Sequence, residues 1–359
     1  MLAVLSMAAL AAVGAMIVKR PAPAANPWPA SDYWQPVDAS RLNVQCRRRL
    51  DEVRHRLQTL PTTSLMAVRG DQVLFHYGSV NQPSLVYSVR KSILAMMYGK
   101  PVSDGRIQLD ANLATLGIDD LGGLLPIERQ ARVRDLLAAR SGVYHAAANA
   151  GDNATSAPPR GSQKPGSYFL YNNWDFNAAG AVFEQQTGRD IYRAFAEDFA
   201  APLGMEDFEL DRQHRGGDPA RSRYLAYHFR LSTRDMARLG ELMLRDGDWH
   251  GNRLLPTGWV RTITTPVTLA RDMHPPHVAR RGLDYGFLWW IPEEPADSPL
   301  DGSYLAWGFY GQYILVVPRR GMVIVHKRDV ALSEGEDARW VYLPEFMEIA
   351  RELVEAPCA

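Results

Sequence analysis

A serine and a lysine three residues apart, Ser88 and Lys91, form the part of the sequence best suited to covalent chemistry. The residues from Ser88 to Gly99 favour a helix that Gly99 and Pro101 end, so both side chains lie on one helix face. Backbone N–H groups at a helix start lack intrahelical partners, and one of them can stabilise an oxyanion. A neutral lysine can accept the serine proton once its environment lowers its pKa from about 10.4. The pair therefore predicts a serine nucleophile with a lysine base.

The alternative interpretation is a serine that caps a helix and an unrelated lysine one turn later, and this motif alone does not exclude it. Composition favours the chemical interpretation. Of 40 basic residues, five are lysines, namely Lys19, Lys91, Lys100, Lys164 and Lys327. Because arginine stays protonated in proteins whereas lysine can lose its proton, a lysine kept at position 91 fits a titrating role.

A second motif, Tyr171-Asn172-Asn173, lies in a loop before a predicted helix. The Tyr171 phenol can relay a proton, and the Asn173 amide can orient a substrate carbonyl or the lysine. The alternative interpretation is a turn with an aromatic anchor that caps the following helix.

A third motif runs from Ala306 to Gln312 and contains Trp307, Gly308 and Phe309. Glycine in a strand lets a ligand approach the backbone closely, and a strand N–H at this place can complete an oxyanion hole opposite Ser88. The alternative interpretation is a bulge or an edge strand.

The elements expected to position these motifs come from both ends of the chain. Apolar residues from Leu42 to Leu57 recur every three or four positions and indicate one buried helix face. Strand-like runs at 64–68 and 72–78 flank a polar turn and indicate a hairpin. Strand character returns at 285–291, and runs at 312–317 and 322–327 indicate a second hairpin.

The region between these strands, residues 101–235, has helical patterns and long loops. A final helix carries Phe346, Ile349, Leu353 and Val354 on one face. This order of elements predicts an α+β fold, with an antiparallel sheet built from both chain ends, flanking helices and an inserted, mostly helical subdomain. We expect that fold to fill a hydrolase domain at 31–359. The helices expected in the middle of the chain span 133–139, 175–187, 191–199 and 232–245, and the longest loop spans 149–166.

Composition excludes several other functions. The chain has 359 residues, 46% of them hydrophobic, and its 40 basic and 40 acidic residues give a formal net charge of zero. We therefore expect no nucleic-acid partner, and we interpret the basic run at 47–49 as the solvated face of a helix. Neither the two cysteines nor the histidines show metal-ligand spacing, so no metal site is predicted.

The N-terminal segment, residues 1–30, is predicted to be a signal or membrane-anchor segment with a linker. Residues 2–18 are apolar or small, Lys19 and Arg20 follow, and 21–30 are rich in Pro and Ala. The pattern favours an exported protein, periplasmic or secreted, or one anchored to a membrane. Cytoplasmic retention stays the alternative, because no basic residue precedes the apolar run and a basic pair follows it.

The three motifs, in this order and at these separations, resemble those of serine β-lactamases and penicillin-binding proteins. The resemblance covers residues 60–355 and extends to the class C type β-lactamases, related esterases and 6-aminohexanoate-dimer hydrolases. Stretches at 135–142, 164–166 and 232–238 also match. The resemblance implies a small-molecule substrate, no cofactor and the following roles: Ser88 as acylated nucleophile, Lys91 and Tyr171 as general base and acid, Asn173, Trp307, Gly308 and Phe309 in substrate binding, and the N–H groups of Ser88 and Phe309 as oxyanion hole.

One departure from the family pattern bears on the substrate. The family's β-lactamases and transpeptidases carry Lys-Thr-Gly or Lys-Ser-Gly where this chain has Ala306-Trp307-Gly308. The cation that would pair with a substrate carboxylate is thus absent, which favours a neutral ester or amide. The alternatives are a cell-wall D,D-peptidase or β-lactamase, and a catalytically silent protein of the same fold.

The resemblance also bears on the two cysteines. Cys46 falls on the apolar stripe of the first helix, and Cys358 follows the last helix. In the fold that the chain resembles, the first and last helices pack side by side, which implies a disulfide if the protein is exported. The alternative, a buried free Cys46 with an unpaired Cys358, stays open.

Overall fold

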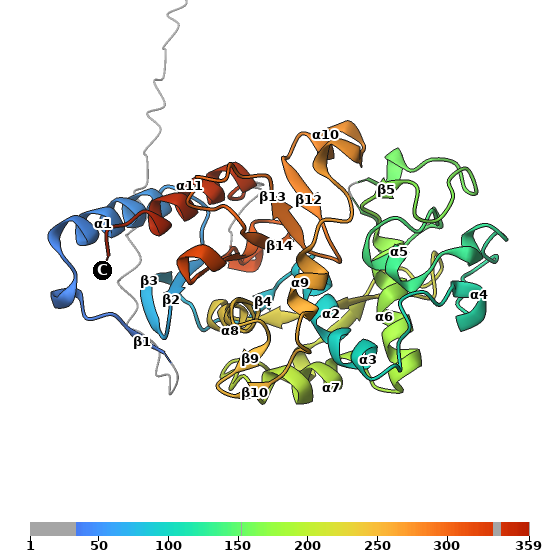
Figure 1. Ribbon diagram of the computed structural model, residues 1–359, viewed down its shortest axis with the longest axis horizontal. Helices are drawn as coiled ribbons and strands as arrows, with labels where there is room; N and C mark the ends of the chain where they lie inside the picture. The colour runs from blue at the N-terminus through green and yellow to red at the C-terminus, as the bar shows by residue number, and fades with distance from the viewer. Residues whose placement is uncertain (1–33, 152, 333–338, 359) are drawn as a thin grey trace, which may run out of the picture.

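The two ends of the chain meet in one sheet of eight strands (Figure 1). The computed structural model describes residues 34–151, 153–332 and 339–358. All neighbouring strands are antiparallel except the first pair. The predicted antiparallel sheet built from both chain ends is therefore confirmed. Across the sheet the strands are β1 (Gln35–Pro36), β3 (Gln72–Gly78), β2 (Ser64–Arg69), β16 (Met322–Lys327), β15 (Gln312–Val317), β14 (Tyr304–Gly308), β13 (Trp290–Pro292) and β12 (Leu283–Tyr285).

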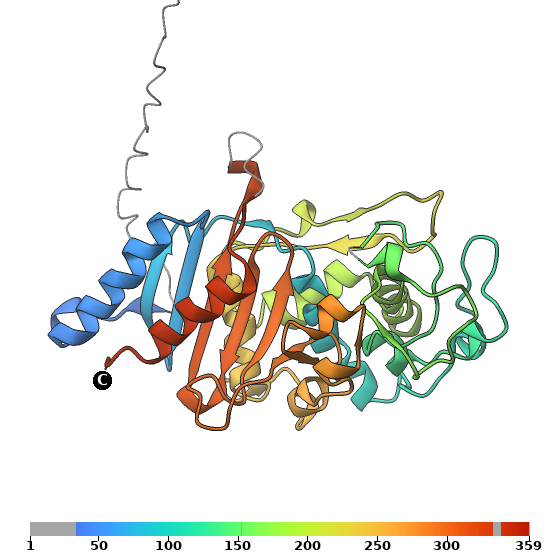
Figure 2. The same cartoon turned by 90° about the horizontal axis from the view of Figure 1, so that it is seen from above.

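Helices cover both faces of this sheet (Figures 1 and 2). Helix α1 (Val44–Gln58) lies beside α11 (Leu343–Val354) on one face, and α8 (Thr233–Leu244) packs on the other. Strands β15 and β16 are consequently buried along their whole length. Helix α8 approaches closely because Gly240 has no side chain: a Cβ there would lie 2.4 Å from Val323 Cγ1. Burial on both faces explains why these central strands are almost continuously apolar.

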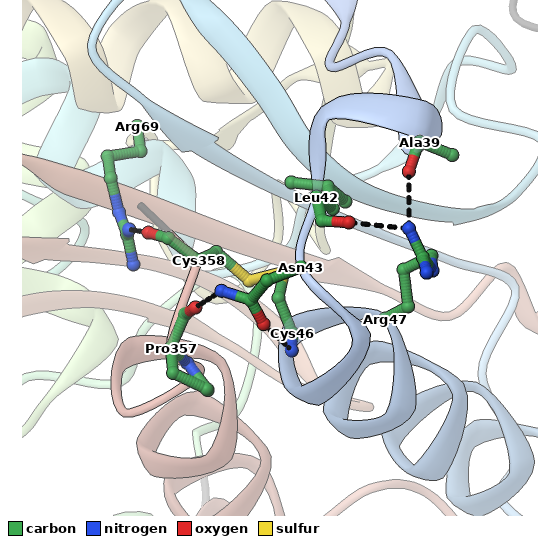
Figure 3. Close-up of a disulfide and its surroundings, with 8 residues drawn as sticks. All are labelled: Ala39, Leu42, Asn43, Cys46, Arg47, Arg69, Pro357 and Cys358. Atoms are coloured by element: carbon green, nitrogen blue, oxygen red, sulfur yellow. Dashed lines mark hydrogen bonds between the residues drawn. A yellow bond between two sulfur atoms is a disulfide. The ribbon is translucent and has the colours of Figure 1, made fainter.

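A disulfide joins the first helix to the chain end that follows the last one (Figure 3). The Cα atoms of Cys46 and Cys358 are 4.9 Å apart, within the range that a disulfide spans. Asn43 Nδ2 donates to the Pro357 carbonyl at 2.6 Å, and Arg69 Nη1 donates to the Cys358 carbonyl at 2.5 Å. The alternative of two unpaired cysteines is therefore wrong.

Reduction of this disulfide is expected to lower the free energy of unfolding by about 2–5 kcal/mol, because the bond restricts an unfolded loop that spans almost the whole chain. The sequence separation of Cys46 and Cys358 is 312 residues. Urea unfolding with and without a reductant measures the effect. The double variant Cys46→Ala, Cys358→Ala is the control, since its midpoint should not respond to the reductant. Two free thiols in the denatured, unreduced wild type would contradict the prediction.

The helix after Ser88 differs from the prediction at its end. Helix α2 (Val89–Met97) ends two residues before Gly99, and α3 (Gly99–Ser103) follows after Tyr98 and includes Pro101. Proline is tolerated there because a backbone N–H in the first turn of a helix has no intrahelical partner. Gly99 and Pro101 therefore lie in the first turn of a second helix and do not lead into a loop.

In the chain, further helices lie between β3 and β12, and those predicted at 133–139 and 175–187 are present. The helix expected at 191–199 begins as α7 and continues as a π-helical turn over Ala196–Ala200. The further helices are α4 (Leu113–Leu116), α5 (Val133–Leu137), α6 (Asn173–Thr187), α7 (Ile191–Phe195), α9 (Trp259–Thr264) and α10 (Pro276–Ala279).

Short strand pairs also occur in this part of the chain, and the sequence did not reveal them. Each strand has only two or three residues, too few for a periodic pattern. The pairs are β4 (Ser84–Leu85) with β8 (Arg230–Leu231), β5 (Phe169–Leu170) with β11 (Met273–His274), β6 (His214–Gly216) with β7 (Ala226–His228), and β9 (Asp248–Trp249) with β10 (Asn252–Arg253).

The strand predicted at 285–291 is wrong in its extent. The chain turns within this run, so that β12 ends at Tyr285 and β13 begins at Trp290. Leu288 adopts a positive φ of 60°, and its N–H donates to the Leu137 carbonyl at 3.0 Å. A contact with a distant helix thus takes the place of the strand ladder.

The N-terminal segment predicted as a signal or membrane anchor, residues 1–30, lies outside the described residues. Within the part of the chain that the structure describes, no helix is long and apolar enough to cross a membrane. Any role of the N-terminal segment therefore stays a prediction from the sequence.

Candidate active site

Ser88 stands at the start of α2, immediately after a residue with unusual backbone geometry. Tyr87 has a positive φ of 48°, which turns the chain sharply from β4 into the helix. The Ser88 side chain makes no capping hydrogen bond to the first turn of α2. Its hydroxyl is therefore not engaged in the helix-capping role that the alternative interpretation assigned to it.

Lys91 connects three of the residues that the sequence singled out. Its Nζ donates to Ser88 Oγ at 3.0 Å, to Tyr171 OH at 2.8 Å and to Asn173 Oδ1 at 2.9 Å. The lysine is only 2% exposed, and its Nζ also lies 4.2 Å from the centre of the Phe176 ring. Ser88 Oγ and Tyr171 OH therefore both lie within hydrogen-bond distance of the Lys91 amine, the distance that proton transfer between these groups requires.

The second motif is held in place by the start of α6. Asn172 caps the helix by accepting the Trp174 N–H at 2.8 Å, and it donates to the buried Asp175 carboxyl at 3.0 Å. Burial raises the pKa of Asp175 well above its usual range. The capping interpretation is therefore correct for Asn172, while the residues on either side of it, Tyr171 and Asn173, contact Lys91.

The third motif reaches the same place from the end of β14. A Cβ on Gly308 would lie 2.3 Å from the Val86 carbonyl oxygen, so only glycine allows the strand to approach the segment before Ser88. The Phe309 ring lies 6.4 Å from the Tyr87 ring. Within the described part of the chain, neither the Ser88 nor the Phe309 backbone N–H donates to a carbonyl. These two donors are the pair that the resemblance to serine β-lactamases implied for an oxyanion hole.

A cleft of about 420 Å³ opens over Ser88 and Tyr171. Aromatic rings form a large part of its walls, which indicates that it accepts apolar or aromatic groups. A second cavity of about 250 Å³ is also lined by Tyr171 and Asn173 and has several alanines in its wall. The other residues that line the cleft are Asn153, Arg280, Arg281, Trp290, Trp307, Gly308, Phe309, Trp340, Tyr342, Leu343 and Pro344.

The structure therefore brings together every residue that the sequence placed in the site. It also adds residues that no motif indicated. Asn153 is 3% exposed and donates to the Tyr171 carbonyl at 3.3 Å, and Phe176 packs under Lys91. Arg280 and Arg281 reach the cleft from a loop after α10. Only the three-dimensional arrangement reveals Asn153, Arg280 and Arg281, because they come from segments outside the three motifs.

The chain matches the family model for beta-lactamases over residues 50–329, a range that contains all three motifs. The chain belongs to the beta-lactamase family. This family includes the β-lactamase type that the motifs resemble, so the resemblance drawn from the sequence is confirmed.

Several solved structures have the same fold as this protein over most of its chain. A candidate 6-aminohexanoate-dimer hydrolase from Bacillus anthracis is 19% identical, with a TM-score of 0.62 over 92% of this chain and 89% of its own. A penicillin-binding protein homologue from Caulobacter crescentus is 17% identical, with a TM-score of 0.61 over 88% and 97%. Simvastatin synthase from Aspergillus terreus is 18% identical, with a TM-score of 0.62 over 88% and 98%. At these identities the likeness shows a shared fold.

Proposed function

We propose that the protein is a serine hydrolase that cleaves a carboxylic ester or amide through an acyl-enzyme on Ser88. The observation that carries the proposal is the position of Lys91, whose Nζ contacts Ser88 Oγ, Tyr171 OH and Asn173 Oδ1 together. This arrangement lies under an aromatic cleft that is large enough for a small substrate.

In the first half of the proposed reaction, Lys91 accepts the Ser88 proton while Oγ attacks the substrate carbonyl carbon. The N–H groups of Ser88 and Phe309 stabilise the oxyanion that forms. The bond to the leaving group then breaks. Tyr171 donates its proton to the leaving oxygen or nitrogen and recovers a proton from Lys91, so the acyl-enzyme forms with no net change in protons.

In the second half, water attacks the acyl carbon. Its proton passes to the Tyr171–Lys91 pair, which returns a proton to Ser88 Oγ as the carboxylic acid leaves. Asn173 accepts a hydrogen bond from Lys91 and holds the amine between the two hydroxyl groups. The net reaction consumes one water for each ester or amide bond.

Tyr171→Phe is expected to lower kcat by about 10²–10⁴-fold with little change in KM. The ring packs 4.7 Å from Phe176 and 5.3 Å from Trp290, so phenylalanine keeps this packing and loses only the phenol. Steady-state kinetics on a 4-nitrophenyl ester separate the two constants. A rise in KM with unchanged kcat would show that Tyr171 only binds substrate.

Covalent labelling tests the proposal. A fluorophosphonate probe and a labelled penicillin are each incubated with the wild type and with Ser88→Ala, and the adduct is located by peptide mass spectrometry. We expect the fluorophosphonate on Ser88 of the wild type alone. Faster labelling by penicillin would favour the D,D-peptidase or β-lactamase alternative, and no label from either probe would favour a catalytically silent protein.

We also propose that the protein is exported or anchored outside the cytoplasm. Two observations support this location: the apolar sequence at 2–18 and the Cys46–Cys358 disulfide, a bond that persists mainly in oxidising compartments. Fractionation of cells that express the full chain tests it. Recovery of all the protein in the cytosol with two free thiols would contradict it.

A further inference from the structure

The turn between β14 and β15 carries the Phe309 N–H, and its backbone conformation needs support. Strand β14 ends at Gly308 and β15 begins at Gln312, so the turn consists of Phe309, Tyr310 and Gly311. Tyr310 has a φ of 60° and Gly311 has a φ of 80°. Left-handed backbone at a residue with a side chain costs free energy and persists only where the surroundings fix it. The contacts that hold this turn therefore also fix the direction of the Phe309 N–H.

His326 on β16 holds the turn from inside the protein. Its Nδ1 lies 2.6 Å from the Gly311 carbonyl oxygen, and its Nε2 lies 3.0 Å from Thr62 Oγ1. Because a carbonyl can only accept a hydrogen bond, Nδ1 carries the proton, and in the neutral ring Nε2 accepts from the Thr62 hydroxyl. Burial lowers the pKa of His326 to about 4, which keeps the ring neutral at ordinary assay pH. His326 is thus fixed in the tautomer that donates to Gly311.

The position of His326 keeps its side chain away from the substrate. The residue is fully buried and is not among the described residues that line the cleft over Ser88. Its ring lies between aromatic neighbours, with ring centres 6.0 Å from Tyr313 and 6.1 Å from Phe346. Any effect of this side chain on the reaction must therefore pass through the Gly311 carbonyl to the turn.

We propose that His326 is a positioning residue for the oxyanion hole, because its hydrogen bond to the Gly311 carbonyl fixes the turn with the Phe309 N–H directed at the oxyanion. The inference rests on the proposed hydrolase function. A donor that is fixed before the reaction stabilises the oxyanion most, since nothing has to reorganise in the transition state. Without this contact the turn can leave its left-handed conformation, and the N–H loses its direction.

Three substitutions of His326 distinguish the two nitrogens of the ring. The side-chain amide of asparagine can take the place of Nδ1, that of glutamine reaches toward the place of Nε2, and leucine replaces neither. We expect His326→Leu and His326→Gln to lower kcat on 4-nitrophenyl butyrate by about 10–10²-fold with little change in KM, because losing a whole oxyanion donor costs about 10²–10³-fold. His326→Asn should restore most of kcat.

Thr62→Val is the matched control. Like His326→Asn, it removes the hydrogen bond between Thr62 and the ring position of Nε2 and keeps a donor for Gly311. Both variants should therefore lower the melting temperature and leave kcat close to that of the wild type.

Inhibition by phenylboronic acid provides a second measurement, because its tetrahedral serine adduct places an oxygen in the oxyanion hole as the transition state does. Its inhibition constant should rise in His326→Leu and His326→Gln by about the factor by which kcat falls. A loss of folded protein alone would lower kcat and leave the inhibition constant unchanged.

The inference is overturned if His326→Leu keeps wild-type kcat, if the asparagine and glutamine variants lose kcat equally, or if kcat falls while the inhibition constant does not change. Should the leucine variant not fold, the comparison of His326→Asn with His326→Gln decides alone. Failure of the hydrolase function looks different. In that case the wild type cleaves no ester and the fluorophosphonate does not label Ser88, whatever residue stands at position 326.

Discussion

Ser88→Ala is expected to abolish ester hydrolysis, with kcat lower by at least about 10⁴-fold. Alanine removes the oxygen that attacks the substrate, and no neighbouring group replaces it as an acyl acceptor. The folded state should hardly change, because the Ser88 side chain caps no helix and accepts a hydrogen bond from Lys91. A change in kcat without a change in melting temperature therefore identifies the nucleophile.

Initial rates with 4-nitrophenyl butyrate and thermal unfolding of the same preparations provide the measurement. Ser103→Ala is the matched control, since Ser103 is an exposed serine on the neighbouring helix α3. It should keep wild-type kinetics. Turnover by purified Ser88→Ala within tenfold of the wild type would exclude Ser88 as the nucleophile and with it the acyl-enzyme mechanism.

The central sheet could be predicted because its signals are local. Two runs of strand-forming residues on either side of a short polar turn indicate a hairpin wherever they occur, and both hairpins, at 64–78 and 312–327, are present. The run at 285–291 has equally apolar residues but turns in its middle. Its turn depends on the contact of Leu288 with Leu137, which lies 151 positions away in the sequence and leaves no local pattern.

The contrast between local signals and long-range contacts also explains which site residues the sequence could predict. Ser88 and Lys91 share one helix face, and the spacing alone brings them together. Tyr171 and Asn173 join them only through the fold, and the sequence placed them there because the order of motifs resembles a known family. Arg281 belongs to no motif. Its approach to Trp307 depends on the loop after α10, so this contact became apparent only from the structure.

Lys91→Arg is expected to lower kcat nearly as far as Lys91→Ala, by about 10³-fold or more, although it keeps the positive charge. Arginine remains protonated at every pH at which the protein is folded, so it cannot accept the Ser88 proton. If Lys91 acted only through its charge, arginine could replace it, and Lys91→Arg would stay active while Lys91→Ala would not. The comparison of the two variants thus separates proton transfer from charge.

Both variants alter a buried site, so stability must be measured beside activity. The Lys91 Nζ lies between Ser88, Tyr171 and Asn173 at 2.8–3.0 Å, and a guanidinium there must displace at least one of them.

A second experiment separates the loss of a base from a distortion of the site. If Lys91 is the base, a small primary amine added to Lys91→Ala should restore part of kcat, and the rescued rate should rise with pH as the added amine loses its proton. Lys91→Arg should show no such rescue, because its side chain fills the space. Activity of folded Lys91→Arg close to that of the wild type would reduce Lys91 to an electrostatic partner and require another base for Ser88.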